Sequence, residues 1–181
     1  IKFSKNIAIV NKESIICGWN LINKELNKFK TNFIPIDSEH FSIYSLIQNN
    51  NLKEIDKVFI TASGGPFLNK SISKSKNISK KEALNHPNWK MGQKISIDSS
   101  TMMNKVFEVI EAKKLFDLKY GNIFILTHPK SYVHAIVKFK NALIKILIHE
   151  PDMKIPIYNS LYSSTIKKIS SQNLNLKILN N

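Results

Sequence analysis

The chain has 181 residues, of which 43% are hydrophobic and 22% are charged, and its formal net charge is +14. This length suits one domain with a substantial core, or one domain with a small extension. No window is apolar enough for long enough to span a bilayer as a helix, so we expect no membrane partner. The chain begins with Ile1 and no secretory signal pattern follows, so we expect a piece of a longer protein.

The basic charge comes entirely from Lys, because the 27 basic residues include no Arg. A charge of this size is typical of proteins that bind nucleic acid. Arg, however, is the preferred bidentate reader of phosphate and guanine. Lys, Asn and Ile are abundant together, as AT-rich codons favour. We therefore attribute the charge to codon composition and expect no nucleic-acid partner.

The first half of the chain alternates between short strands and helices. The patterns predict a strand at 5–10, a helix at 15–29, an extended segment at 33–36, a helix at 39–48 and a strand at 57–62. Gly64-Gly65-Pro66 ends the last strand. Cys17 lies within the first helix, and as a lone cysteine we expect it to be a small buried residue.

The second half begins with a polar loop and ends with paired strands. The patterns predict a loop at 69–81, a strand at 94–97, a helix at 101–117 capped by Ser99 or Ser100, strands at 123–126, 132–139 and 142–149, and a short helix at 155–162. The fold class is α/β (α+β), with a mixed sheet flanked by helices. We expect one domain at 1–163 with a flexible flap at 69–91, followed by a polar tail at 164–181.

Asp37 and Glu39 are separated by one residue, which suggests a shared site. On an extended backbone, alternate side chains lie on the same face, so both carboxylates can point into one site. Paired carboxylate oxygens suit Mg²⁺ or Mn²⁺. The alternative is that Asp37 and Ser38 cap the following helix and that Glu39 lies in its first turn. His40 alone indicates little.

The helix after Ser99 carries several polar residues at one-turn spacing. Asn104 and Lys105 precede Glu108 by four and three residues. One interpretation is a Lys–Glu pair on a solvated face. The other is that Asn104 and Lys105 hold a phosphate near the helix start, and that Glu108 joins the two earlier carboxylates as a third metal ligand.

Two further motifs are weaker by themselves. Ser63-Gly64-Gly65 follows a strand directly and can offer a hydroxyl and backbone N–H groups to a phosphate, although Gly-Gly there is usually only a turn. His86-Pro87-Asn88-Trp89 ends the polar loop, and its Trp89 either covers a small ligand or anchors the loop to the core.

Taken in order, these motifs resemble the 1-deoxy-D-xylulose 5-phosphate reductoisomerase family. The resemblance runs through the segments 11–14 (NKES), 35–40 (PIDSEH), 63–67 (SGGPF), 86–105 (HPNWKMGQKISIDSSTMMNK), 128–129 (HP), His134 and 151–157 (PDMKIPI). Both the order and the spacing agree with the family, over most of the chain.

The resemblance implies roles for individual residues. Asp37, Glu39 and Glu108 would be the divalent-metal ligands and, with Lys12, the catalytic residues. The substrate-binding residues would be Lys12, Ser38, Glu39, Ser63, His86, Ser99, Asn104, Lys105 and Glu108, with the phosphate on Ser63, Ser99, Asn104 and Lys105. Trp89 and Met91 would belong to the flap, and Asn11, Glu13 and Gly92 would contact NADPH. The role of His134 stays open.

The resemblance also implies an activity: NADPH- and Mn²⁺- or Mg²⁺-dependent conversion of the phosphorylated sugar 1-deoxy-D-xylulose 5-phosphate to 2-C-methyl-D-erythritol 4-phosphate, in isoprenoid biosynthesis. A homodimer in a bacterial cytoplasm or a plastid is expected. The family's N-terminal NADPH domain and C-terminal helical domain are not recognised in this sequence, which has no G-x-G-x-x-G.

Three residues depart from the family pattern. Val106 replaces the usual Gly after Asn-Lys, Phe41 replaces a smaller residue, and Ser100 replaces the usual Ala. A bulkier residue at 106 could crowd the phosphate helix. The alternative hypothesis is therefore a degenerate, non-catalytic relative that binds a ligand or a partner.

Overall fold

The computed structural model describes residues 1–71, 78–87, 89, 91–162 and 168–170. In chain order its elements are β1 (Asn6–Ile9), α1 (Lys12–Phe29), β2 (Asn32–Pro35), α2 (Ser38–Ile47), the 3₁₀ turn η1 (Leu52–Glu54), β3 (Ile55–Ala62), α3 (Lys80–Leu84), α4 (Gln93–Ser100), α5 (Met103–Phe116), the 3₁₀ turn η3 (Tyr120–Asn122), β4 (Ile123–Thr127), β5 (Val133–Phe139), β6 (Ile144–Ile148) and α6 (Lys154–Leu161). Most of the predicted tail and part of the predicted flap lie outside the described residues.

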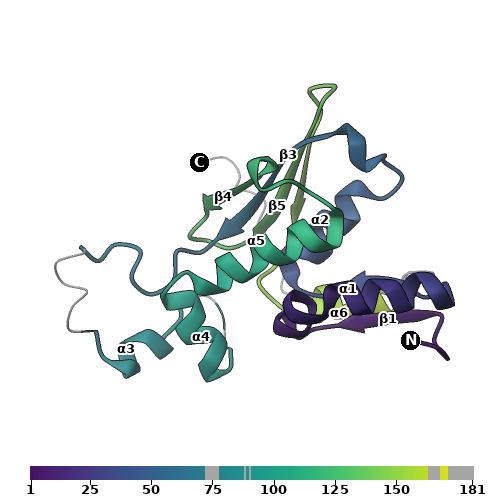
Figure 1. Ribbon diagram of the computed structural model, residues 1–181. Coiled ribbons are helices and arrows are strands. Elements are labelled where there is room, and N and C mark those ends of the chain that lie inside the picture. The colour runs from purple at the N-terminus through teal and green to yellow at the C-terminus, as the bar shows by residue number, and fades with distance from the viewer. Residues whose placement is uncertain (72–77, 88, 90, 163–167, 171–181) are drawn as a thin grey trace.

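A four-stranded mixed sheet, in the order β4-β3-β5-β6, forms the centre of the fold. β3 runs parallel to β4 and antiparallel to β5, and β5 runs antiparallel to β6. β1 and β2 form a separate parallel pair beside α1 (Figure 1). The prediction of an α/β fold with a mixed sheet flanked by helices is confirmed.

Helices α2 and α5 pack on one face of this sheet, and the hydrophobic core lies between them and the strands (Figure 1). Its fully buried members include Ile43 of α2, Ala112 of α5, and Val58 and Ile60 of β3. Burial of these apolar side chains stabilises the packing of the helices on the sheet. The core therefore fixes the first turns of α2 and α5 relative to the carboxyl end of β3.

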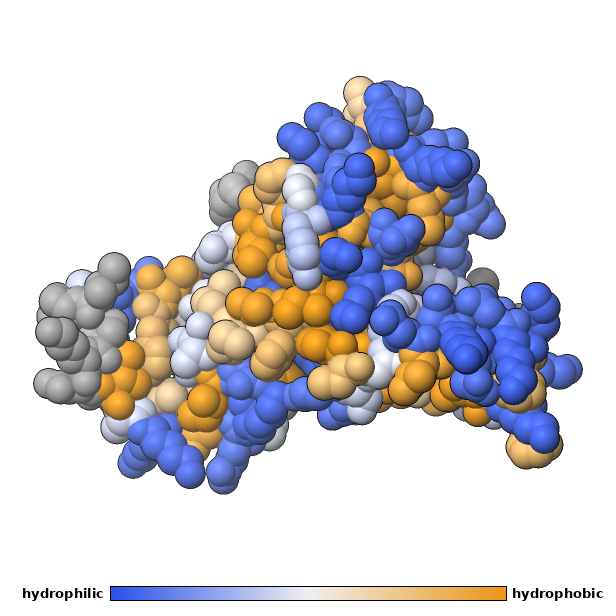
Figure 2. All heavy atoms as spheres, viewed as in Figure 1, coloured by the Kyte–Doolittle hydropathy of each residue, from blue (hydrophilic) through white to orange (hydrophobic). Residues whose placement is uncertain are grey.

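The edge strands leave apolar side chains exposed. Phe124, Ile125 and Leu126 of β4 and Ile144 and Ile146 of β6 are all exposed. Figure 2 shows apolar side chains gathered over β4 and the middle of the molecule, whereas α1 is covered by hydrophilic ones. A row of exposed apolar residues on edge strands is typical of a surface that another chain covers.

Most predicted elements are confirmed within one to three residues. The helix that begins at Lys12 starts earlier than its apolar pattern because Asn11 caps it, with Asn11 Oδ1 accepting a hydrogen bond from the Ser14 backbone N–H at 2.8 Å. The hairpin of β5 and β6 and the short helix containing Pro156 also form as predicted.

The strand predicted at 94–97 is wrong, because α4 spans this segment. Ile95 and Ile97 alternate with polar residues as in a strand. In the structure Ser96 is the buried residue, and its hydroxyl donates to the Gly92 carbonyl oxygen at 3.0 Å. Packing of α4 beside α3 and α5 overrides the weak local pattern of a four-residue segment.

The predicted Ser99 or Ser100 cap is also wrong. Both serines end α4, and Ser100 Oγ donates to the Ile97 carbonyl oxygen at 2.7 Å. The chain then turns through Met102, whose φ of 62° lies in the left-handed region, before α5 begins at Met103.

Cys17 is exposed, which corrects the expectation that it is buried. It lies on the outer face of α1, whereas Ile15 and Leu26 face inward. Among the helices of the described residues, none is both long enough and apolar enough to cross a bilayer.

The core packing predicts a large effect for truncation of Ile60, which is fully buried at the centre of β3. We expect Ile60→Ala to lower the free energy of unfolding by about 2–5 kcal/mol, because it removes buried methyl groups and leaves a cavity. Chemical denaturation measures this change. Leu52→Ala, at an exposed apolar position in η1, is the control and should change stability by less than about 0.5 kcal/mol. Equal losses in both variants would contradict the assignment of the core.

Candidate active site

A cavity of about 230 Å³ lies where the carboxyl end of β3 meets the first turns of three helices. Helix α1 begins at Lys12, α2 at Ser38 and α5 at Met103. Helix starts carry unpaired backbone N–H groups, so such a position favours anionic ligands.

The cavity gathers residues from distant parts of the sequence. The residues predicted to bind metal or substrate or to form the flap all line it, and they are Lys12, Asp37, Ser38, Glu39, Ser63, His86, Trp89, Met91, Ser99, Asn104, Lys105 and Glu108. The three predicted cofactor residues do not line this cavity.

Three carboxylates converge in the cavity. Asp37, Glu39 and Glu108 each offer an oxygen, and these three atoms lie within 4.8 Å of one another. The carboxylates of Asp37 and Glu39 do not converge through an extended backbone, because α2 already begins at Ser38. Asp37 occupies the N-cap position of α2, as the alternative interpretation of a helix cap predicted. Its side chain, however, makes no capping hydrogen bond. Its carboxylate is instead directed into the cluster.

Two buried lysines lie among these carboxylates. Lys12 Nζ is 2.6 Å from Asp37 Oδ2 and 3.2 Å from Glu108 Oε1. Lys105 Nζ is 3.2 Å from Glu39 Oε1, also pairs with Glu108, and donates to the backbone carbonyl of Thr61. The interpretation of Lys105 and Glu108 as a solvated pair is wrong, since they are only 5% and 1% exposed.

The pKa values of these groups reflect their crowding. Burial would lower the pKa of Lys12, but the charges of Asp37 and Glu108 raise it well above its usual value. Burial would likewise raise the pKa of Glu39, but the Lys105 ammonium group holds it below its usual value. Burial and the charge of Glu39 together raise the pKa of Glu108.

This donor set fits a divalent cation. Mg²⁺ and Mn²⁺ prefer oxygen ligands, and three carboxylates supply them. Burial and then repulsion from the Glu39 carboxylate raise the pKa of Glu108, and a divalent cation would relieve that repulsion. Asp37, Glu39 and Glu108 can therefore hold such an ion.

Neutral donors line the other side of the cavity. Ser63 Oγ lies 3.1 Å from His86 Nε2 and accepts from the Gly65 backbone N–H. The Trp89 backbone N–H donates to His86 Nδ1 at 3.0 Å, so Nδ1 is the acceptor and Nε2 carries the proton in the neutral ring. Burial lowers the pKa of His86, which favours this neutral form.

Gly65 brings this strand end close to α4. Its φ is 66°, and a Cβ there would lie 2.9 Å from the Ser99 carbonyl oxygen. Glycine is needed here for both conformation and space. The close approach brings Ser63 and Ser99 to the same side of the cavity.

The predicted cofactor residues lie together outside the cavity. Asn11 Nδ2 donates to Glu13 Oε2 at 3.0 Å, and Glu13 pairs with Lys94 of α4. Gly92 is the N-cap of α4, and a Cβ there would meet nothing within 4 Å. Gly92 therefore borders open space next to α4.

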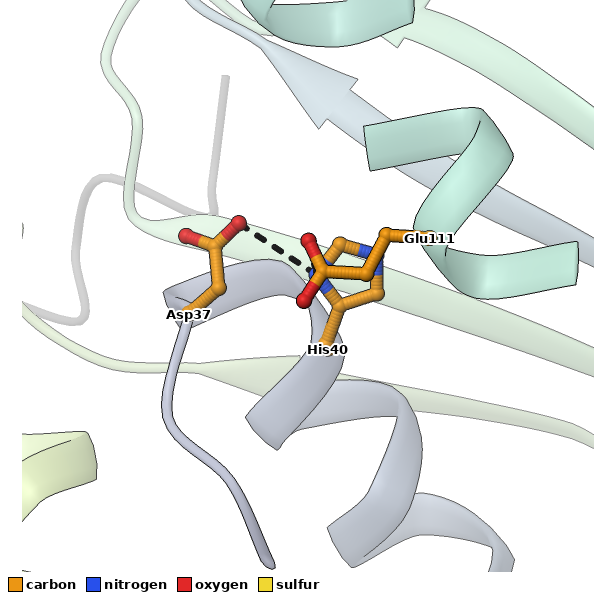
Figure 3. A group of neighbouring side chains, drawn as sticks. All are labelled: Asp37, His40 and Glu111. Atoms are coloured by element: carbon orange, nitrogen blue, oxygen red, sulfur yellow. Dashed lines mark ion pairs between the residues drawn. The ribbon is translucent and has the colours of Figure 1, made fainter. Parts of the chain in front are cut away.

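His40 connects two of the helices that build the site. The ring is fully buried; its Nδ1 lies 3.3 Å from Asp37 Oδ2 and 3.3 Å from Glu111 Oε2, and its Nε2 lies 2.9 Å from the Glu108 carbonyl oxygen (Figure 3). Burial would lower the pKa of His40, but Glu111 and Asp37 raise it to about 9.

Sequence reasoning gave no role to several residues at the site. Val10, Thr61, Ile95, Met102, Ser131 and Met153 line the cavity, and Glu111 lies behind it. Glu111 could have been identified from the sequence, because it lies one helical turn after Glu108 and therefore on the same side of the helix. His134, whose role was left open, also lines the cavity and stacks on His149 with ring centroids 3.7 Å apart.

The raised pKa of His40 predicts a specific pH dependence in metal-free protein. Its folded-state pKa of about 9 exceeds the unfolded value of about 6.5. Stability from the protonated ring is therefore fully present below about pH 6.5 and is lost as the pH rises through about 9. Denaturation between pH 6 and 10 with a chelator present measures this fall.

We expect His40→Gln to remove the fall in stability between pH 6.5 and 9, and the control His128→Gln, outside the cavity, to retain it. An NMR titration that gave His40 an ordinary pKa near 6.5 would contradict the prediction.

Comparison with known proteins shows which proteins this chain is similar to in sequence. The family model described as "1-deoxy-D-xylulose 5-phosphate reductoisomerase C-terminal domain" matches residues 33–116. The 1-deoxy-D-xylulose 5-phosphate reductoisomerase of Pelagibacter ubique is 64% identical over 181 residues, which are all of this chain and 47% of that protein. The Clostridium acetobutylicum protein of the same name is 45% identical over 161 residues, 89% of this chain and 42% of its own length.

Solved structures agree with the sequence relatives. The Zymomonas mobilis reductoisomerase in complex with NADPH superposes with a TM-score of 0.87 at 34% identity, covering 97% of this chain and 45% of that one. A DOX-P reductoisomerase in complex with NADPH, fosmidomycin and magnesium gives 0.84 at 42% identity, covering 97% and 49%. The chain thus spans about half the length of the curated relatives it matches. Sequence and fold together place the chain in the 1-deoxy-D-xylulose 5-phosphate reductoisomerase family.

Proposed function

We propose that this chain supplies the metal- and substrate-binding site of an NADPH-dependent 1-deoxy-D-xylulose 5-phosphate reductoisomerase. The reaction isomerises and reduces 1-deoxy-D-xylulose 5-phosphate to 2-C-methyl-D-erythritol 4-phosphate, a step of isoprenoid biosynthesis. The observation that carries the proposal is the convergence of Asp37, Glu39 and Glu108 in one cavity with two buried lysines.

The carboxylate side of the cavity would act on the reacting end of the substrate. Asp37, Glu39 and Glu108 would hold Mg²⁺ or Mn²⁺, which when bound stabilises negative charge on the substrate oxygens. Lys12 Nζ, 2.6 Å from Asp37, can donate to a substrate oxygen at the same place. Its raised pKa keeps this group an ammonium donor at neutral pH.

Four other groups that line the cavity would hold the substrate phosphate. Ser63, Ser99 and Asn104 offer neutral donors, and Lys105 offers a positive charge. Lys105 already meets oxygens of Glu39, Glu108 and Thr61, and an ammonium group has three N–H donors. Lys105 can therefore bind phosphate only by giving up one of these contacts. Binding at the phosphate end contributes energy that orients the reacting carbons.

The cofactor and the covering segment complete the proposal. NADPH would supply the hydride and would contact Asn11, Glu13 and Gly92. Trp89 and Met91, which line the cavity, would exclude water from the bound substrate as part of a flap at 69–91. Residues 1–163 would form the catalytic and metal-binding domain. The similar solved structures are named as complexes with NADPH and, in one of them, with magnesium, which supports the proposed cofactor and the proposed metal ion.

The alternative of a degenerate relative rested on Val106. This residue is 45% exposed and does not line the cavity. Its side chain therefore does not crowd the phosphate side, and the steric reason for lost activity disappears.

Two further features belong to this proposal. We infer a homodimer in which the exposed apolar residues of β4 and β6 are covered by the second copy, because exposed apolar side chains favour burial. We also infer a bacterial cytoplasmic location, since the relatives compared above are bacterial.

The metal site predicts dependence of turnover on the three carboxylates. In the intact protein, NADPH oxidation with 1-deoxy-D-xylulose 5-phosphate should require Mg²⁺ or Mn²⁺ and stop when EDTA is added. Asp37→Asn and Glu108→Gln should each reduce kcat/KM by more than the roughly 10- to 100-fold that loss of a ligand's hydrogen-bond partner usually costs. Calorimetric titration of Mn²⁺ should show weakened binding in both variants.

The matched control for the metal site is Asp56→Asn, an acidic residue at the start of β3 and outside the cavity. Turnover that persisted in EDTA, or Mn²⁺ binding unaffected by both site variants, would refute the proposed site. A folded wild-type protein that bound Mn²⁺ without any turnover would favour the degenerate relative.

The apolar edge predicts the oligomeric state. Ile125→Glu in β4 should shift a dimer toward monomer in light scattering, because a buried unpaired charge opposes association. Leu21→Glu, at an exposed position on α1, is the control and should leave the dimer intact. A wild-type monomer at micromolar concentration would contradict the inferred assembly.

A further inference from the structure

Behind the cavity, Glu111 is a buried acid that the proposed reaction does not use. It lies on α5 one turn after Glu108, is 2% exposed and does not line the cavity. Removing a carboxylate from water is unfavourable unless a partner compensates. Its neighbours Ala112 and Phe116 belong to the apolar core, so packing alone would favour an apolar residue at 111.

The compensating partner of Glu111 is His40. Among the described residues, the His40 ring is the one group within ion-pair distance of the Glu111 carboxylate, at 3.3 Å. Figure 3 shows the carboxylates of Asp37 and Glu111 both directed at the His40 ring, where each lies 3.3 Å from Nδ1. The ring is also stacked on Phe116, with centroids 6.4 Å apart. The ring therefore has little freedom to rotate.

His40 in turn holds two parts of the candidate metal site. Because a carbonyl oxygen only accepts, Nε2 must donate to the Glu108 backbone. Nδ1 on the opposite side of the ring faces Asp37 Oδ2, the same oxygen that Lys12 contacts. The ring thus links the α5 backbone at one metal-ligand position to the side chain of another on α2.

We propose that Glu111 is a positioning residue: by holding the His40 ring, it fixes the orientation of the Asp37 carboxylate relative to Glu108. This role rests on the proposed function, since Asp37 and Glu108 serve there as metal ligands. Groups that orient ligands are often needed nearly as much as the ligands. Glu111 does not line the cavity, and among the described residues its carboxylate forms its ion pair with His40.

The test measures Mn²⁺ affinity of the intact protein from the electron paramagnetic resonance signal of free Mn²⁺. We expect Glu111→Gln, which keeps the size but removes the charge, to weaken binding about 10-fold. Glu54→Gln, an exposed acid in η1, is the matched control and should bind like the wild type. Circular dichroism verifies that each variant is folded.

A double-mutant cycle separates positioning from a general effect on packing. Because Glu111 acts through His40, Glu111→Gln should add little to the loss already caused by His40→Asn. Additive losses, or unchanged affinity in folded Glu111→Gln, would overturn the role. If Glu111→Gln does not fold, Glu111→Asp gives the same comparison, because it keeps the charge but withdraws the carboxylate from the ring.

Stoichiometry provides the remaining check. The ligand atoms of Asp37, His40 and Glu111 lie within 4.8 Å of one another, so a second Mn²⁺ ion lost in Glu111→Gln would make Glu111 a ligand and overturn the positioning role. A wild type that binds no Mn²⁺ would overturn the proposed metal site as well. Normal wild-type binding and turnover with an unaffected Glu111→Gln would overturn this inference alone.

Discussion

The site depends on a balance of opposite charges in a space that water hardly reaches. Lys12 and Lys105 lie between three carboxylates, and each of these five groups is far more costly to bury alone than together. The three helices that start at the cavity each bring at least one charge, so none can move away without leaving a charge unpaired. Charge pairing and the hydrophobic core between α2, α5 and the sheet therefore stabilise the same arrangement.

This charge balance also suits the site for ligands. Burial and the charge of Glu39 raise the pKa of Glu108, and a cation would offset both effects. Lys12 and Lys105 neutralise part of the charge of the three carboxylates. The His40 ring behind the cavity is packed on Phe116, its Nε2 donates to the Glu108 carbonyl oxygen, and its Nδ1 lies within ion-pair distance of Glu111.

The regular elements follow from patterns that act over short distances. Alternation in β5 and β6 and the apolar face of α1 were sufficient to predict those elements. The errors lie where local signals are short or ambiguous. Ile95 and Ile97 alternate as in a strand, but packing beside α3 and α5 makes α4 a helix. Cys17 is apolar enough for a core, but its position on α1 faces outward.

The sequence by itself determined the chemical types at the site and their order, because the acidic, amide, hydroxyl and lysine residues occur in motifs long enough to resemble one family. Only the tertiary structure decided which of these groups meet. Lys12 and Glu108 are 96 residues apart in sequence and 3.2 Å apart in space. No local pattern encodes that contact or the pairing of Glu111 with His40, because both arise from how α1, α2 and α5 pack around one sheet, and packing depends on the whole chain.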